Sequence, residues 1–163
     1  MAPTKTDPLG ETISDAPSAE VMLANNINPL TGLASDYLNH FNEAIMLLEM
    51  LPDVPECLED FLAWQPLSYC EHFMASHLGG REVAIKAYEA ADPKIRMQFD
   101  AITDTMTSIL ATVANALRTE EQARINLPLA GQSAEWLKTM VCLAGGVINN
   151  GIAPDVDTIL DRQ

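Results

Sequence analysis

The most regular hydrophobic pattern in the chain runs from Asp92 to Arg118. Its apolar residues recur at alternating spacings of four and three, which places them along one face of an α-helix. Asp92 can accept hydrogen bonds from the free amides of a first turn, and Pro93 suits the first helical position because it lacks an amide hydrogen. We therefore predict one long helix over 92–118. Its apolar seam is Ile95, Phe99, Ile102, Met106, Ile109, Val113 and Ala116.

Shorter stretches carry the same periodicity, and Pro or Gly residues separate them. Ser133 is the expected N-cap of one such helix, and Gly145-Gly146 either ends that helix or marks the close approach of a neighbour. No alternating apolar run indicates a strand. We predict an all-α fold, a single bundle of six to seven helices. Besides 92–118, the expected helices are 36–51, 55–64, 67–78, 81–91, 133–148 and 154–161.

Residues 1–33 are rich in Pro, Ser, Thr and Asp and have no aromatic residue, so they are expected to form a flexible N-terminal tail. A turn of helix over 20–24 is the one part of this tail expected to dock on the core. The helical-bundle domain is then 34–163. Within it, helices 36–51 and 92–118 are expected to pack against each other, and 133–148 to complete the core.

Each of two further stretches fits two interpretations. Residues 119–131 look polar and irregular, although 120–126 can extend the long helix. The acidic segment 154–161 either closes the core or acts as a peptide that docks on a partner. Neither reading changes the expected fold class.

Charge is the most unusual total of this chain. Of its 163 residues, 23 are acidic and 9 basic, which gives a formal net charge of −14. No Lys or Arg occurs between Thr6 and Gly80. Such a surface repels nucleic-acid phosphates and anionic lipid, so we expect neither nucleic acid nor membrane as a direct partner. It favours a basic protein surface or a cation, although a charged face that merely keeps the protein in solution is the simpler reading.

The location follows from what the sequence lacks. No apolar run approaches the ~20 residues of a membrane-spanning helix, and the N-terminus has no basic start followed by an apolar stretch. A cytoplasmic location is therefore expected. Cys57, Cys70 and Cys142 are odd in number and widely spaced, without a zinc-binding pattern, so they are expected to be reduced thiols packed as small hydrophobic groups. No cofactor is expected.

One face of the predicted helix 36–51 has an unexpected composition. Met46 and Met50 fall on its polar side, together with Glu43 and Glu49. A methionine on an outward face often contacts another element or chain, because its flexible side chain adapts to irregular surfaces. These four residues are the candidate partner-binding site. The same face is also a candidate homodimer contact, in which the partner is a second copy of the chain.

Two alternatives use histidine. His40 and Glu43 are three residues apart on one helix and are candidate metal ligands, with Glu71, His72 and His77 on another helix. The simpler reading of His40 is a boundary residue with one satisfied hydrogen bond. His72 is also the candidate for histidine phosphotransfer, which needs an exposed imidazole near a positive group.

Enzymatic chemistry has little support in the sequence. Nucleophilic catalysis by Cys70 near His72, or by Cys57, is disfavoured because the surrounding negative charge raises a thiol pKa. No phosphate-binding glycine loop, dinucleotide fingerprint or calcium loop is present. The preferred prediction is a non-enzymatic, acidic helical protein that acts as an interaction or regulatory module. The alternative is a metal-binding or histidine-phosphotransfer bundle.

Overall fold

The computed structural model describes residues 16–76 and 79–153. Within these ranges the fold is all-α, as predicted, and a two-stranded antiparallel sheet is the sole β structure. None of the described helices is both long enough and apolar enough to cross a membrane. The elements, in chain order, are α1 (Ala19–Ala24), β1 (Ile27–Asn28), β2 (Leu33–Ala34), the 3-10 helix η1 (Ser35–Tyr37), α2 (Leu38–Met50), α3 (Cys57–Ala63), α4 (Tyr69–Ala75), α5 (Arg81–Ala90), α6 (Pro93–Ala116), α7 (Glu120–Ile125) and α8 (Leu127–Asn150).

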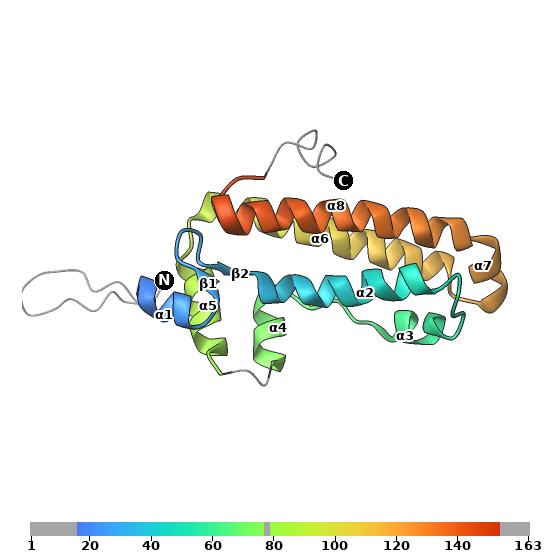
Figure 1. Cartoon of the computed structure of the whole chain (residues 1–163), viewed down its shortest axis with the longest axis horizontal. Coiled ribbons are helices and arrows are strands. Elements are labelled where there is room, and N and C mark those ends of the chain that lie inside the picture. Colours follow the sequence, from blue (N-terminus) through green and yellow to red (C-terminus); the bar gives the residue numbers. More distant parts are fainter. Residues whose placement is uncertain (1–15, 77–78, 154–163) are drawn as a thin grey trace, which may run out of the picture.

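Three long helices, α2, α6 and α8, lie side by side and form the body of the molecule (Figure 1). The closest packing joins α8 to α2 and α8 to α6. Small side chains at Ala130, Ala134 and Ala144, all fully buried, let both neighbours approach α8 closely. Helices α2 and α6 approach each other less closely than either of them approaches α8. Tyr37, the last residue of η1 before α2, contacts Phe99 of α6, with their ring centroids 6.0 Å apart.

The long helix begins and ends close to the predicted residues. The Asp92 side chain accepts from the Lys94 amide at 2.8 Å, and Pro93 is the first helical residue. The next segment departs from the prediction in two ways. Glu120–Ile125 forms a separate helix instead of extending the long one, and 127–131 is the start of α8 instead of an irregular stretch. Thr119 caps α7 as a separate helix, and the side-chain amide of Asn126 donates to the carbonyl of Ala116 at 2.8 Å. This hydrogen bond holds the sharp corner between α6, α7 and α8.

Helix α8 is much longer than predicted. It starts at Leu127, six residues before the expected cap Ser133, and continues through Gly145 and Gly146 to Asn150. Ser133 is fully buried within the helix. A Cβ at Gly145 would meet no other atom within 4 Å, so the glycine marks no close approach there. Gly151 follows the last residue of α8 as its C-cap, with a φ of +74°.

The folded unit also begins earlier than predicted. Ile27 and Leu33, inside the expected tail 1–33, are 1% and 0% exposed. Their strands pair in antiparallel register, with Ile27 opposite Ala34, so the expectation of no strand was wrong as well. The Thr31 hydroxyl donates to the Ile148 carbonyl at 2.6 Å and fastens this hairpin to the end of α8. Helix α1 confirms the predicted docking turn, whereas 1–15 and 154–161 lie outside the described residues.

Helices α4 and α5 lie near the start of α2 (Figure 1). Aromatic rings from α4, α5 and the residue before α2 contact one another there. The buried side chains of α4 are Tyr69 and Phe73, whereas Met74, predicted for the same face, is 60% exposed. Tyr69 stacks on Tyr88 at 4.7 Å between ring centroids. The Tyr69 hydroxyl accepts from the Ala34 amide at 2.9 Å, so the cluster also ties the hairpin to α4.

Ser133 offers a test of the packing around α8. Its hydroxyl is buried and has no hydrogen-bond partner among the described residues. An unsatisfied buried polar group costs about 1–3 kcal/mol, so Ser133→Ala is expected to raise the free energy of unfolding, measured by urea denaturation. Ser108→Ala is the control, because Ser108 is exposed on α6 and its substitution changes only the helix propensity. Equal effects of the two substitutions would show that the buried hydroxyl carries no penalty.

Candidate functional site

The outward face of α2 carries the predicted partner-binding residues. Met46 is 51% exposed and Met50 is 39% exposed. Glu43 and Glu49 are exposed beside them. Residues four apart on a helix lie above one another, so the two methionines form a row along the helix axis. The structure thus places all four predicted residues on one accessible surface.

The row of exposed apolar side chains continues past the end of α2. Val54 lies four residues beyond Met50 and is 38% exposed. Its amide donates to the Met50 carbonyl at 2.9 Å, so the backbone makes one more helix-like turn there. Sequence reasoning missed Val54, because Pro52 indicated that the helix stops. The spacing of four from Met46 to Met50 to Val54 was the available signal. We call these three residues the α2 row.

Charged groups around the α2 row are mainly acidic. Glu49 forms an ion pair with Lys138 of α8, and Glu135 pairs with the same lysine at 2.8 Å. The Lys138 ammonium donates hydrogen bonds to these two carboxylates, and these bonds, the one to Glu135 first, raise the pKa of Lys138 to about 12. Glu43 forms no ion pair with a described residue. The lysine therefore balances one flank of the row, and the Glu43 carboxylate remains available to a partner.

His40 has the local role of a boundary histidine. Its Nε2 lies 2.7 Å from the Gln65 carbonyl oxygen, and its ring stacks on Trp64 at 4.6 Å. The Trp64 indole in turn donates to the His40 carbonyl at 3.0 Å. Among residues 16–76 and 79–153, no three His, Cys, Asp or Glu side chains are grouped so that they could hold a metal ion. The pair His40 and Glu43 is thus without a third ligand in the part of the chain that the structure describes.

His72 lies in a different environment from the one predicted. It was expected to point away from the packed face, but it is half-buried, with its ring 5.6 Å from Tyr37 and 6.1 Å from His40. Helix α4 crosses the start of α2, and this crossing brings the two histidines together. Glu71 is engaged in a capping box with Ser68, in which the Glu71 carboxylate accepts from the Ser68 amide at 2.8 Å. His77 lies outside the described residues.

Burial shifts the pKa of two of the groups that sequence analysis considered for chemistry, His72 and Cys70. Burial lowers the pKa of His72, and the nearby His40 lowers it further, while Asp36 acts in the opposite direction. Burial also raises the pKa of the Cys70 thiol, followed in size by the charges of Glu89 and Asp100. A thiol with a raised pKa is protonated at neutral pH and is a poor nucleophile. Cys57 is buried in the core, and Cys142 is exposed on α8.

His72 is expected to make the free energy of unfolding depend on pH. Because its pKa in the folded state is below the unfolded value of about 6.5, the unfolded state binds more protons as the pH falls through that value. The contribution of the neutral ring is complete above about pH 6.5 and is lost below it. Urea denaturation at pH 7 and pH 5 measures this loss. His72→Phe keeps a ring and cannot titrate, so it should show a smaller loss than the wild type; equal losses would contradict this assignment.

Comparisons with known proteins add no family to this description. The chain matches no protein-family model, no curated protein and no solved structure.

Proposed function

We propose that this protein is a non-enzymatic interaction module that binds a basic protein surface through the α2 row. The observation that carries this proposal is the row itself. Three apolar side chains, Met46, Met50 and Val54, are exposed in one line, with acidic residues beside them. Apolar surface removed from water contributes about 25 cal/mol per Å², so covering this row is favourable.

Methionine suits such a surface for a physical reason. Its unbranched side chain and polarizable sulfur adapt to irregular partners, and binding proteins use it in that way. The core side of the same helix is filled by Phe41, Ile45 and Leu48, which are at most 3% exposed. Helix α2 is therefore fixed in the bundle by one face and presents the other, so little ordering of the backbone is needed on binding.

The charge of the chain argues for the kind of partner. No Lys or Arg occurs between Thr6 and Gly80, a segment that includes all of α2 and the α2 row. Acidic residues around an apolar strip attract a basic surface and repel an acidic one. A second copy of this chain would place Glu43 and Glu49 near their equivalents across a two-fold contact. We therefore propose a different, basic protein as the partner rather than a homodimer.

The proposal is tested by affinity capture with three baits. They are the wild type, Met46→Glu with Met50→Glu, and the matched control Met74→Glu with Met97→Glu. Met74 and Met97 are 60% and 71% exposed on other helices, so the control makes the same chemical change elsewhere. Each bait is incubated with an extract of the cells that make the protein, and retained proteins are quantified by mass spectrometry.

The expected result is a basic protein retained by the wild type and by the control, and reduced at least about tenfold with the α2 variant. Each charge placed on a desolvated apolar contact is unfavourable, which supports a change of that size. Equal retention by all three baits would contradict the proposal. A dimer mass in native mass spectrometry that the α2 variant alone converts to a monomer would show a homodimer contact instead.

A further inference from the structure

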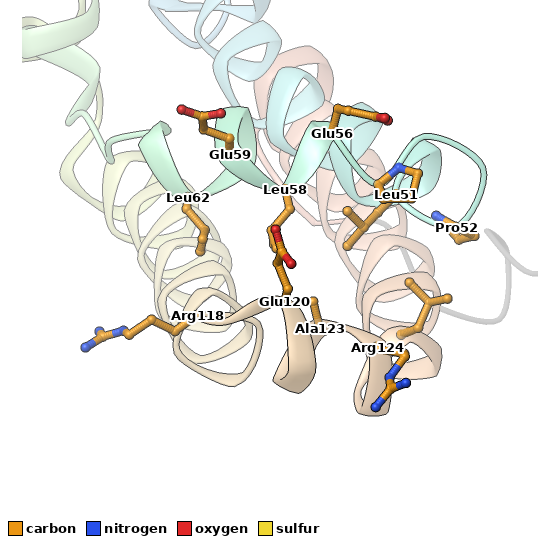
Figure 2. A pocket seen from close by; sticks show the side chains of 12 residues that line it. Leu51, Pro52, Glu56, Leu58, Glu59, Leu62, Arg118, Glu120, Ala123 and Arg124 are labelled. Atoms are coloured by element: carbon orange, nitrogen blue, oxygen red, sulfur yellow. The ribbon is translucent and has the colours of Figure 1, made fainter.

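A cleft of about 740 Å³ opens at the end of the bundle, between α3 and α7. Its lining comes from α3, from the link between α2 and α3, and from the corner where α6, α7 and α8 meet. Figure 2 shows α3 along one side of the cleft and α7 along the other. This volume lies within the range of about 300–1,000 Å³ that is typical of binding clefts.

The interior of the cleft is apolar because α3 is short and uses only one side for the core. Cys57 and Phe61 are buried, at 7% and 2% exposure. Leu58 and Leu62, on the neighbouring face of α3, are half-buried and point towards α7 (Figure 2). Leu127 lines the same space from the start of α8. The leucines of α3 thus lie over an open slot instead of a packed helix.

The two sides of the cleft carry different charges. Glu56 and Glu59 lie on the α3 side, whereas Arg118 and Arg124 lie on the opposite side, near the two ends of α7 (Figure 2). Neither arginine forms an ion pair with a described residue, although the Arg118 guanidinium donates to the Asn115 side chain. The Glu120 side chain extends from the start of α7 into the cleft, towards Leu58 (Figure 2).

We propose that this cleft binds an amphipathic helix of another protein. The apolar stripe of that helix covers Leu58 and Leu62, its basic edge lies along the α3 side, and its acidic edge lies along Arg118 and Arg124. In this mode of binding, the bound helix places apolar side chains three and four residues apart in the groove, and charged side chains flank them. A small anionic ligand fits less well, because three carboxylates and two guanidinium groups line the cleft and leave it net negative.

The cleft is distinct from the α2 row, and the two sites make separate predictions. Binding at the α2 row needs basic groups on the partner, whereas the cleft needs basic and acidic groups on opposite edges of one helix. The α2 variant Met46→Glu with Met50→Glu is therefore expected to leave binding at the cleft unchanged. Failure of either proposal does not imply failure of the other.

Fluorescence anisotropy with synthetic helical peptides of about 18 residues, or five turns, tests the cleft. All three labelled peptides carry the same leucine stripe. The first has Lys along one edge and Glu along the other, the second has Lys along both edges, and the third has Glu along both. Each is titrated with the full chain. The mixed peptide is expected to bind most tightly, because it alone pairs charges on both sides of the cleft.

Two charge variants locate the binding. Arg118→Glu with Arg124→Glu is expected to weaken binding of the mixed peptide about tenfold. Arg81→Glu with Lys94→Glu makes the same change in net charge at exposed residues outside the cleft, and it should alter the affinity less than about twofold. Leu58→Ala with Leu62→Ala should also weaken binding of this peptide, with circular dichroism as the check that the helices persist.

Three results would overturn the proposal. Tightest binding of the all-Lys peptide, with equal loss in both charge variants, would show general attraction to an acidic protein. Tightest binding of the all-Glu peptide would show that the arginines alone select the ligand. A dimer in native mass spectrometry that only the Arg118 and Arg124 variant dissociates would show that a second copy of the chain occupies the cleft.

Discussion

Phe99→Ala is expected to lower the free energy of unfolding by about 3–5 kcal/mol, because the vacated volume in the core cannot be refilled. Phe99 is fully buried on α6, and its ring lies 6.0 Å from Tyr37 and 5.9 Å from Tyr69. It therefore joins the long-helix body to the aromatic cluster of α4. Since domains are stable by only about 5–15 kcal/mol in total, this one substitution removes a large part of the margin.

Urea denaturation followed by circular dichroism measures the effect of Phe99→Ala, and Met97→Ala is the control on the same helix. Met97 is 71% exposed, and surface substitutions of this kind change the free energy of unfolding by about 0.5 kcal/mol or less. Similar losses in the two variants would contradict the placement of Phe99 at the centre of the core.

Gly32→Ala is expected to destabilise the fold by about 2–4 kcal/mol, from backbone strain and a steric clash together. Gly32 has a φ of +72°, and a Cβ built there would lie 2.8 Å from the carbonyl oxygen of Ala87 on α5. That oxygen belongs to the backbone of a helix and cannot move alone. The substitution should therefore loosen the β1–β2 hairpin from α5 and weaken its attachment to α8.

Gly145→Ala makes the same chemical change as Gly32→Ala, but it is expected to have the opposite effect on stability. Gly145 lies within α8 and has open space around its Cβ position. Alanine in a helix interior is favoured over glycine by about 0.5–1 kcal/mol, so this variant should be more stable than the wild type. Thermal denaturation of both variants measures the two opposite changes in stability relative to the wild type. A loss of stability for Gly145→Ala would contradict a continuous α8, and no loss for Gly32→Ala would contradict the packing of the hairpin on α5.

The long helices could be predicted because their own periodicity carries the signal. The seam from Ile95 to Val113 keeps the spacing of an α-helix for five turns, and the Asp92-Pro93 start agrees with it. Local rules misplaced the start of α8. Pro128 and Gly131 resemble the punctuation of a loop, but Pro128 lies in the first turn, where proline is tolerated, and Gly131 meets no neighbour.

Other features depend on contacts between residues that are far apart in the sequence, and no short stretch of sequence reveals these contacts. Each strand of the hairpin has two residues, too few for an alternating pattern, and burial of Ile27 and Leu33 follows from packing on distant helices. The proximity of His40 and His72 arises from the crossing of two helices. The exposure of Met46 and Met50 was accessible from the sequence, because a single helix determines which way its side chains face. The cleft could not be predicted from the sequence, because it is a gap between two helices, α3 and α7, that are distant in the chain.

The most direct test of the α2 row is methyl NMR on protein labelled at the methionine methyl groups. The partner retained in the affinity capture is added stepwise, and each methyl resonance is followed. The proposal predicts that the resonances of Met46 and Met50 shift or broaden in proportion to bound partner, while those of the exposed Met74 and Met97 stay unchanged. Unchanged Met46 and Met50 resonances at saturating partner would contradict the proposal that this face is the binding site.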